Sequence, residues 1–299
     1  MQAAKDWFTY KNWKPHAFQK QTWKYIADGY SGMLNAPTGY GKTYAVWFGV
    51  LHDFLNRSKA KKSDPKGLHC LWIMPLRALS KEIENAALQV SHDLKLPYTI
   101  GSRTGDTTAK EKAAHKKQMP HALITTPESM HLMLAQKGYA KKKKKLQFVI
   151  VDEWHELLGT KRGVQVELAL SRLRTINPEL KVWGISATIG NLQEAKDILL
   201  GAASEKGVMV KAAIEKKTII ETVLPDVLEK FPWAGHLGLK LGQKVLEIIH
   251  KSNSTLIFTN TRFQAETWYR HLLDLEPDLA GLFALHHGSL GEDTRKWVE

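Results

Sequence analysis

Short apolar runs alternate with longer segments of helical periodicity along the first two thirds of this chain. Continuous apolar runs bounded by polar residues are typical of strands that are buried on both faces of a parallel sheet. The predicted strands are Leu68–Met74, Tyr98–Ile100, Ala122–Thr125, Phe148–Val151 and Val182–Ile185. The predicted helices are Thr43–Leu55, Leu79–Val90, Ser129–Ala135 and Val166–Thr175. The alternation predicts an α/β fold, in which crossover helices cover both faces of a parallel sheet.

A second series of the same kind follows a change in composition. Small residues and glycines over residues 201–207 indicate a domain edge. We therefore predict one domain over residues 1–205, and a linker with a second domain over residues 206–299. Its predicted elements are helices at Val245–His250 and Gln264–Leu275 and strands at Thr255–Phe258 and Leu282–Leu285. The roughly 80 residues of this series are fewer than the ~100–150 of a typical domain, which predicts an incomplete one.

The composition favours a nucleic-acid partner and a reducing compartment. The net charge of +13 indicates binding to a polyanion, most often nucleic acid. Cys70 is the single cysteine, so the chain has no internal disulfide, which fits the cytosol. No apolar stretch approaches the ~18 residues of a membrane span, and the N-terminus lacks the apolar core of a signal peptide. We expect a cytoplasmic protein with no membrane partner.

The most informative motif is N-A-P-T-G-Y-G-K-T at residues 35–43. Glycines before a G-K-T triplet are typical of a loop whose backbone N–H groups hold phosphates at the start of a helix. Lys42 is expected to bring a positive charge to the β- and γ-phosphates, and Thr43 to offer its hydroxyl to Mg²⁺. Ala36 stands where the first glycine is usual, and a surface turn before a helix is the alternative interpretation. The candidate nucleotide-binding residues here are Thr38, Gly39, Gly41, Lys42 and Thr43.

Two carboxylates directly follow the strand-like run Phe148–Val151. Open parallel sheets bind ligands at the carboxyl ends of their strands. Asp152 is expected to hold Mg²⁺, directly or through water, and Glu153 to orient and deprotonate an attacking water. The alternative is a helix N-terminus with acidic residues in its first turn. The phosphate-loop motif upstream favours the catalytic interpretation.

Two further features lie near these motifs. Ser186 and Thr188, in G-I-S-A-T after another apolar run, are candidates for coupling the γ-phosphate site to a neighbouring domain. An ordinary exit from a strand is the alternative for them. His155, which follows the acidic pair, is a candidate member of the catalytic group and a candidate link between the nucleotide site and the second domain.

Taken together, the motifs resemble those of superfamily 2 DExH-box helicases, more narrowly the Lhr-like branch, and within it the ligase-associated DEXH-box helicases of bacteria. Besides the phosphate loop, the matching segments are W-K-P-H-A-F-Q (13–19), P-L-R-A-L (75–79), T-T-P-E-S (125–129), S-A-T-I-G-N-L (186–192), T-N-T-R (259–262) and H-H-G-S-L (286–290). The run D-E-W-H-E-L-L-G-T-K-R-G at residues 152–163 is the most specific of them. The resemblance covers essentially the whole chain.

The resemblance implies a RecA-like first domain that binds ATP and Mg²⁺, followed by an incomplete second RecA-like domain. It also implies that Gln19 contacts the adenine. The residues that it places along a nucleic-acid track are Arg77, Arg103, Gly105, Thr126 and Pro127 in the first domain, and Thr261, Arg262 and His287 in the second. The residues themselves agree only in part, since helix caps, a helix started by proline and a solvated arginine are structural alternatives.

By the same resemblance, the chain is the N-terminal motor fragment of an ATP-dependent DNA helicase or translocase. Movement 3′ to 5′ along single-stranded or partly duplex DNA, and a repair role beside a DNA ligase and a nuclease, are implied with it. Family members continue with two later motifs that this chain does not show, and one of them brings arginines to the γ-phosphate. We therefore expect nucleotide binding with weak hydrolysis. The alternatives are an RNA helicase, a DNA-dependent ATPase that does not unwind, and a nucleotide-gated nucleic-acid binding module.

Overall fold

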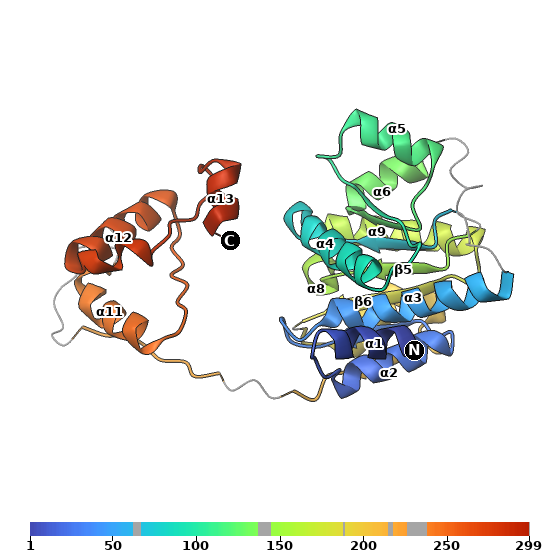
Figure 1. Cartoon of the computed structure of the whole chain (residues 1–299), viewed down its shortest axis with the longest axis horizontal. Helices are drawn as coiled ribbons and strands as arrows, with labels where there is room; N and C mark the ends of the chain where they lie inside the picture. Colours follow the sequence, from blue (N-terminus) through green and yellow to red (C-terminus); the bar gives the residue numbers. More distant parts are fainter. Residues whose placement is uncertain (62–66, 137–144, 188, 215–217, 226–237, 299) are drawn as a thin grey trace. The chain divides into compact units, whose positions relative to one another are not determined.

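The computed structural model describes residues 1–61, 67–136, 145–187, 189–214, 218–225 and 238–298. The chain forms two compact units, Met1–Glu215 and Lys216–Glu299. Figure 1 labels the elements of both units. The domain boundary expected between residues 205 and 206 stays a prediction.

A sheet of seven strands forms the centre of the first unit, and every neighbouring pair of strands is parallel. The strands are β1 (Gly32–Asn35), β2 (Cys70–Ile73), β3 (Ile100–Arg103), β4 (Ala122–Thr125), β5 (Phe148–Val151), β6 (Lys181–Ser186) and β7 (Val208–Lys211). Their order across the sheet is β3-β4-β2-β5-β6-β1-β7. The predicted parallel α/β fold is confirmed. The strand expected at Tyr98–Ile100 lies instead at Ile100–Arg103, because pairing with β4 begins only at Ile100.

Helices cover both faces of this sheet (Figure 1). The described α-helices of this unit are α1 (Gln2–Tyr10), α2 (Ala17–Ala27), α3 (Lys42–Lys61), α4 (Arg77–Asp93), α5 (Ala109–Lys117), α6 (Pro127–Leu134), α8 (Trp154–Leu157), α9 (Lys161–Ile176) and α10 (Leu192–Leu200). Successive side chains of a strand point to opposite faces, so each face has its own core. One core joins the strands to α1, α2, α3 and α4, and the other joins them to α6, α8, α9 and α10.

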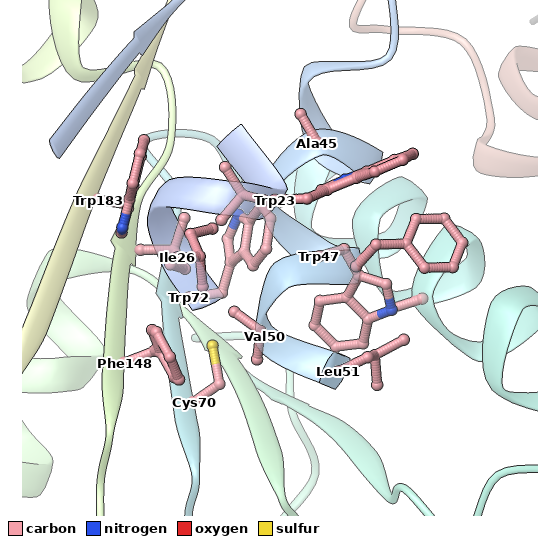
Figure 2. Packing of buried hydrophobic residues seen from close by; sticks show 14 of the residues in the cluster. Trp23, Ile26, Ala45, Trp47, Val50, Leu51, Cys70, Trp72, Phe148 and Trp183 are labelled. Atoms are coloured by element: carbon pink, nitrogen blue, oxygen red, sulfur yellow. The ribbon is translucent and has the colours of Figure 1, made fainter. Parts of the chain in front are cut away.

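Large aromatic side chains fill the core between α2, α3 and the sheet (Figure 2). Trp47 on α3 and Trp72 on β2 are 1% and 0% exposed, and their ring centroids lie 5.8 Å apart. Trp23 on α2 and Trp183 on β6 belong to the same core. Each aromatic side chain removes about 150–250 Å² of surface from water when it is buried. This core therefore holds α3, and the loop that precedes it, on the sheet.

The strand order explains how motifs that are distant in the sequence come together. β6 lies between β5 and β1, and the three strands run in the same direction. The segments that follow them therefore lie at one edge of the sheet, where α/β proteins bind ligands. These segments are the phosphate loop after β1, the acidic pair after β5 and the S-A-T motif after β6. Ala36 N donates to Ser186 O at 3.1 Å, which joins two of them directly.

The second unit contains α11 (Gly242–Lys251), α12 (Arg262–Leu275) and α13 (Glu292–Val298). Leu246, Leu272 and Leu279 form its small apolar core. The predicted helices Val245–His250 and Gln264–Leu275 are confirmed as parts of α11 and α12.

The two strands predicted for the second unit are wrong. Residues 255–258 and 283–285 have no regular secondary structure, and Leu256 and Phe258 are 81% and 89% exposed. A strand is stable only when neighbours satisfy its backbone hydrogen bonds and cover its side chains. These segments therefore have the apolar pattern of strands, but no described strand pairs with them.

None of the helices in the described part of the chain combines the length and the apolar character that a membrane span requires.

Gly49 provides a test of the contact between α2 and α3. A Cβ at this position would lie 2.5 Å from Ile26 Cδ1 and 2.9 Å from Ile26 Cβ. Alanine normally stabilises a helix interior by about 1 kcal/mol relative to glycine. Here we expect Gly49→Ala to lower the free energy of unfolding by about 1–3 kcal/mol, because the two helices must move apart. Urea denaturation followed by tryptophan fluorescence measures the change.

Ile26→Val, which removes the Cδ1 methyl group, completes a double-mutant cycle. We expect Gly49→Ala to destabilise the Ile26→Val protein less than it destabilises the wild type. A Gly49→Ala protein as stable as the wild type, or more stable, would contradict the close packing of α2 on α3.

Candidate active site

The loop between β1 and α3 has the backbone conformation of a phosphate cradle. Gly39 and Gly41 have φ angles of 87° and 75°, in the left-handed region that glycine adopts without strain. A Cβ on Gly41 would lie 2.8 Å from Gln19 Nε2. α3 begins at Lys42, so the free N–H groups of its first turn and the positive end of its dipole lie at this loop.

Lys42 is buried at this loop without a hydrogen bond. Its side chain is 8% exposed, and its Nζ has no hydrogen-bond partner among the described residues. Thr43 is half-buried beside it, and Thr38 is exposed at the tip of the loop. A buried ammonium without hydrogen bonds is costly unless a partner compensates it, and an anionic ligand is the natural partner. Thr38, Gly39, Gly41, Lys42 and Thr43 therefore lie together in one loop, and their binding of phosphate stays a prediction.

Gln19, expected at the adenine, lies on α2 next to the phosphate loop. Its side chain is buried, with 2% of its surface exposed. Its Nε2 donates to Gly41 O at 3.0 Å, and its Oε1 accepts from His16 N at 2.8 Å. The amide of Gln19 thus ties α2 to the loop, and its contact with adenine stays a prediction.

The acidic pair lies next to the phosphate loop. Lys42 Nζ is 3.9 Å from Glu153 Oε1, and Glu153 Oε2 is buried with no hydrogen bond to any described residue. Glu153 has φ 45° and ψ 46°, a left-handed conformation that is uncommon for residues other than glycine. Such conformations cost free energy and cluster at functional sites. The sheet therefore brings together the two side chains that sequence reasoning assigned to the phosphate and to the water.

Asp152 is held by two hydrogen bonds in a buried position. Its Oδ1 accepts from Glu153 N at 2.9 Å, and its Oδ2 accepts from Trp72 Nε1 at 3.0 Å. Burial raises the pKa of Asp152 to about 6, and the nearby charge of Glu153 adds to the rise. The two hydrogen bonds and the charge of Lys42 oppose it in part.

A chain of polar contacts connects the acidic pair to β6. His155 Nδ1 lies 3.4 Å from Glu153 Oε2 and 3.3 Å from the Oγ of Ser186, which is fully buried. His155 Nε2 lies 3.6 Å from Glu156 Oε1. The other candidate coupling residue, Thr188, lies outside the described residues. The link from His155 and Ser186 to a second domain stays a prediction.

The side chains at this edge suit a triphosphate with a magnesium ion. Magnesium prefers oxygen ligands and, at phosphate sites, is held by one or two protein groups together with phosphates and waters. The carboxylate of Asp152 and the hydroxyl of Thr43 are ligands of that kind. The Nζ of Lys42 and the Oε2 of Glu153 are buried without hydrogen bonds to described residues. Phosphate oxygens would accept from Lys42, and a water beside the phosphate would donate to Glu153. The residues at this edge therefore fit a triphosphate and a magnesium ion.

The nucleic-acid candidates of the first unit follow the other half of the sheet. Arg77 is the first residue of α4, after β2. Arg103 ends β3 with 7% of its surface exposed, and Gly105 is exposed. Thr126 caps α6 with its side chain, and Pro127 is the first residue of that helix. Because β2, β4 and β3 are parallel neighbours, these residues gather at the carboxyl edge of the sheet, and their contact with nucleic acid stays a prediction.

In the second unit, the candidates lie around the start of α12. Thr261 caps this helix by accepting a hydrogen bond from Gln264 N. Arg262 Nη1 donates to Ser289 Oγ at 3.0 Å, and His287 Nε2 lies 3.3 Å from Glu266 Oε1. The two motifs that carry them are therefore in contact, and their role toward nucleic acid stays a prediction.

Sequence reasoning missed two residues of this site. Trp72 donates to Asp152, and Asn35 Nδ2 donates to Ala187 O at 2.5 Å, which joins the phosphate loop to the S-A-T motif. Trp72 is fully buried in β2 and Asn35 is half-buried at the end of β1, where the period of two explains their placement without any polar role. Their one signal is a side-chain N–H donor within or at the end of an apolar run.

The raised pKa of Asp152 predicts how stability depends on pH. The usual pKa of this carboxyl is 3.8 and its pKa in the fold is about 6, so the folded state binds its proton more tightly. Its contribution to stability is therefore full below pH 4 and is lost as the pH rises to about 6. An asparagine does not titrate. We expect the stability of Asp152→Asn relative to the wild type to rise by on the order of 2 kcal/mol between pH 4 and 7.

Urea denaturation of both proteins at several pH values measures this difference. Parallel stability curves over that range would contradict a raised pKa for Asp152.

Three comparisons with known proteins agree with this geometry. The model of the DEAD/DEAH box helicase family matches residues 16–196. The ATP-dependent helicase Lhr-Core protein 2 of Thermococcus barophilus is 34% identical over 291 residues, which are 92% of this chain and 33% of that protein. The structure of the Mycobacterium smegmatis helicase Lhr bound to ssDNA and AMP-PNP is 28% identical with a TM-score of 0.75, and the match covers 99% of this chain and 39% of that one.

The Lhr helicase/uracil glycosylase of Escherichia coli is 29% identical over 303 residues, 91% of this chain and 19% of that protein. This chain thus spans about a third or less of the length of these curated relatives. The seven-stranded sheet is RecA-like, as in the Lhr structure. Since the family model matches more than half of its residues, the chain belongs to the DEAD/DEAH box helicases, among which its relatives are Lhr helicases.

Proposed function

We propose that this chain is the ATP-binding motor part of an Lhr-type helicase that moves on single-stranded DNA. One observation carries the proposal: Lys42 Nζ and Glu153 Oε1 lie 3.9 Å apart, and both side chains have a buried polar atom without a hydrogen bond. A phosphate-binding cation beside a carboxylate that can accept a proton from water is the arrangement that ATP hydrolysis needs. Ser186 of the S-A-T motif contacts the segment before Lys42 and the segment after Glu153: its carbonyl accepts from Ala36 N, and its hydroxyl lies 3.3 Å from His155 Nδ1.

Each residue has a distinct part in this proposal. The backbone of residues 38–43 and the Nζ of Lys42 bind the phosphates and balance their charge. Glu153 Oε2 accepts the proton of the attacking water, and His155 Nδ1 lies 3.4 Å from that oxygen. Asp152 and Thr43 would hold magnesium, which would supply charge stabilisation to the phosphates. The closed aromatic core beneath α3 keeps the loop fixed.

DNA is the nucleic acid that we propose, on a track over the carboxyl ends of β2, β4 and β3. Support comes from the net charge of +13 and from the related Lhr structure, which is bound to ssDNA. We also propose that the second unit is part of a second RecA-like domain, which its contacting T-N-T-R and H-H-G-S-L motifs support. Movement 3′ to 5′, a repair role and ligase or nuclease partners rest on the family resemblance.

Glu153→Gln and Lys42→Ala separate chemistry from binding. We expect Glu153→Gln to keep the nucleotide affinity of the wild type while single-turnover ATP hydrolysis slows by about 10²–10⁴-fold, because the proton acceptor is lost. Lys42→Ala should weaken nucleotide binding itself, because the phosphates lose their buried cation. Fluorescence of a methylanthraniloyl nucleotide measures binding, and quenched-flow with labelled ATP measures hydrolysis.

Glu156→Gln is the matched control, since it removes a mostly exposed carboxylate from α8, the short helix that directly follows Glu153. We expect its hydrolysis to equal that of the wild type. Hydrolysis by Glu153→Gln at the rate of the wild type would show that Glu153 is not the proton acceptor.

Competition between DNA and RNA strands tests the proposed partner. We expect single-stranded DNA to displace a labelled DNA strand better than RNA of the same sequence. The affinity should fall as salt rises, because phosphate contacts release counterions. Stronger competition by RNA would replace the DNA proposal with an RNA helicase.

A further inference from the structure

Trp72 occupies the strand next to the acidic pair. It lies on β2, which pairs in parallel register with β5, so that Trp72 is opposite Ile150. The pairing continues past the strand ends, since Asp152 N donates to Ile73 O at 2.9 Å. The indole is completely buried, and its Nε1 donates to Asp152 Oδ2 at 3.0 Å. The tryptophan thus reaches the acidic pair from inside the sheet.

The hydrogen bond from Trp72 fixes the orientation of the Asp152 carboxylate. Asp152 Oδ1 accepts from Glu153 N at 2.9 Å, so one oxygen accepts from a side chain of β2 and the other from the backbone that follows β5. Two donors on two oxygens prevent the carboxylate from rotating. An indole N–H donates and never accepts, so it always presents a proton to this oxygen. A carboxylate oriented in this way has its remaining lone pairs in a fixed direction.

The indole of Trp72 lies in the aromatic core between α3 and the sheet. Trp72 contacts Trp47 on α3, with ring centroids 5.8 Å apart and an angle of 57° between the planes. Figure 2 shows both rings in the core with Trp23 and Ile26 of α2. α3 begins at Lys42, so the same core supports the phosphate loop and the donor to Asp152.

We propose that Trp72 is a positioning residue: its hydrogen bond orients the carboxylate of Asp152 so that this carboxylate can bind magnesium at the nucleotide site. This inference rests on the proposed function, in which Asp152 and Thr43 hold the ion. Groups that hydrogen-bond to a metal ligand orient it and commonly change metal affinity about 10- to 100-fold when they are removed. Trp72 itself touches neither nucleotide nor metal. Removing the Trp72 donor should therefore weaken magnesium binding and leave the binding of metal-free nucleotide unchanged.

Trp47 offers a matched control in the same core. It is as buried as Trp72 and packs against it. Its Nε1 is also buried, but it has no hydrogen-bond partner in the part of the chain that the structure describes. Trp47→Phe and Trp72→Phe remove the same atoms from the same core, and only Trp72→Phe removes a donor from Asp152.

The test measures how nucleotide binding depends on magnesium. Methylanthraniloyl-ADP is titrated onto each protein in EDTA, and magnesium is then titrated at fixed nucleotide. We expect Trp72→Phe to bind the nucleotide in EDTA as the wild type does, and to need about 10- to 100-fold more magnesium for half of the metal-dependent change. Trp47→Phe should keep the magnesium midpoint of the wild type.

A wild-type magnesium midpoint in Trp72→Phe, or an equal shift in both variants, would overturn the proposal and leave the proposed function intact. A wild-type protein that binds no nucleotide with magnesium would overturn both. Should Trp72→Phe fail to fold, benzothienylalanine at position 72 keeps the shape of the indole and replaces N–H by sulfur. The same midpoint shift is expected for it, and an unchanged midpoint refutes the positioning role.

A second readout reports the hydrogen bond itself. The indole N–H resonance that disappears in Trp72→Phe identifies Trp72 in a ¹⁵N spectrum of the metal-free protein. We expect Asp152→Asn to shift this resonance, and Glu156→Gln to leave it in place. A Trp72 resonance that does not respond to Asp152→Asn would contradict the hydrogen bond on which the inference depends.

Discussion

The site depends on the close approach of one ammonium and one carboxylate that are far apart in the sequence. Lys42 and Glu153 meet because β6 separates β1 from β5 in a parallel sheet, so that the segments after all three strands share an edge. Their 3.9 Å separation leaves the Nζ of Lys42 and one oxygen of Glu153 buried without hydrogen bonds. Folding alone does not favour such groups, since burying them without partners costs free energy. A triphosphate would supply acceptors to Lys42, and a water between the phosphate and Glu153 would donate to the carboxylate oxygen.

The rest of the first unit holds these groups against that cost. Aromatic packing under α2 and α3 fixes the helix that begins with Lys42, and Gln19 ties α2 to the loop through Gly41. The left-handed backbone of Glu153 is a second local cost, which the hydrogen bond from Glu153 N to Asp152 helps to offset. The raised pKa of Asp152 is a third. Unfavourable local conformations that cluster in one place, and that the surrounding structure holds, are typical of functional sites.

The buried strands and the phosphate loop could be predicted from the sequence because both depend on local patterns. Apolar runs such as Phe148–Val151 are buried on both faces, so their strand character is visible without a partner. Gly41 and Lys42 belong to a motif whose local geometry fixes its chemistry. Contacts across the sheet were not visible, because the donor role of Trp72 depends on the register between β2 and β5. The strands expected at 255–258 and 282–285 failed because pairing is not a local property.

The central claim is that a triphosphate binds between Lys42 and Glu153. A crystal structure of the chain with a non-hydrolysable ATP analogue and magnesium tests it most directly. The account predicts the terminal phosphate in contact with Lys42 Nζ, the metal beside Asp152 and Thr43, and Glu153 Oε2 facing a water in line with that phosphate. A nucleotide bound elsewhere, or one whose phosphates leave Lys42 and Glu153 without a ligand, would contradict it.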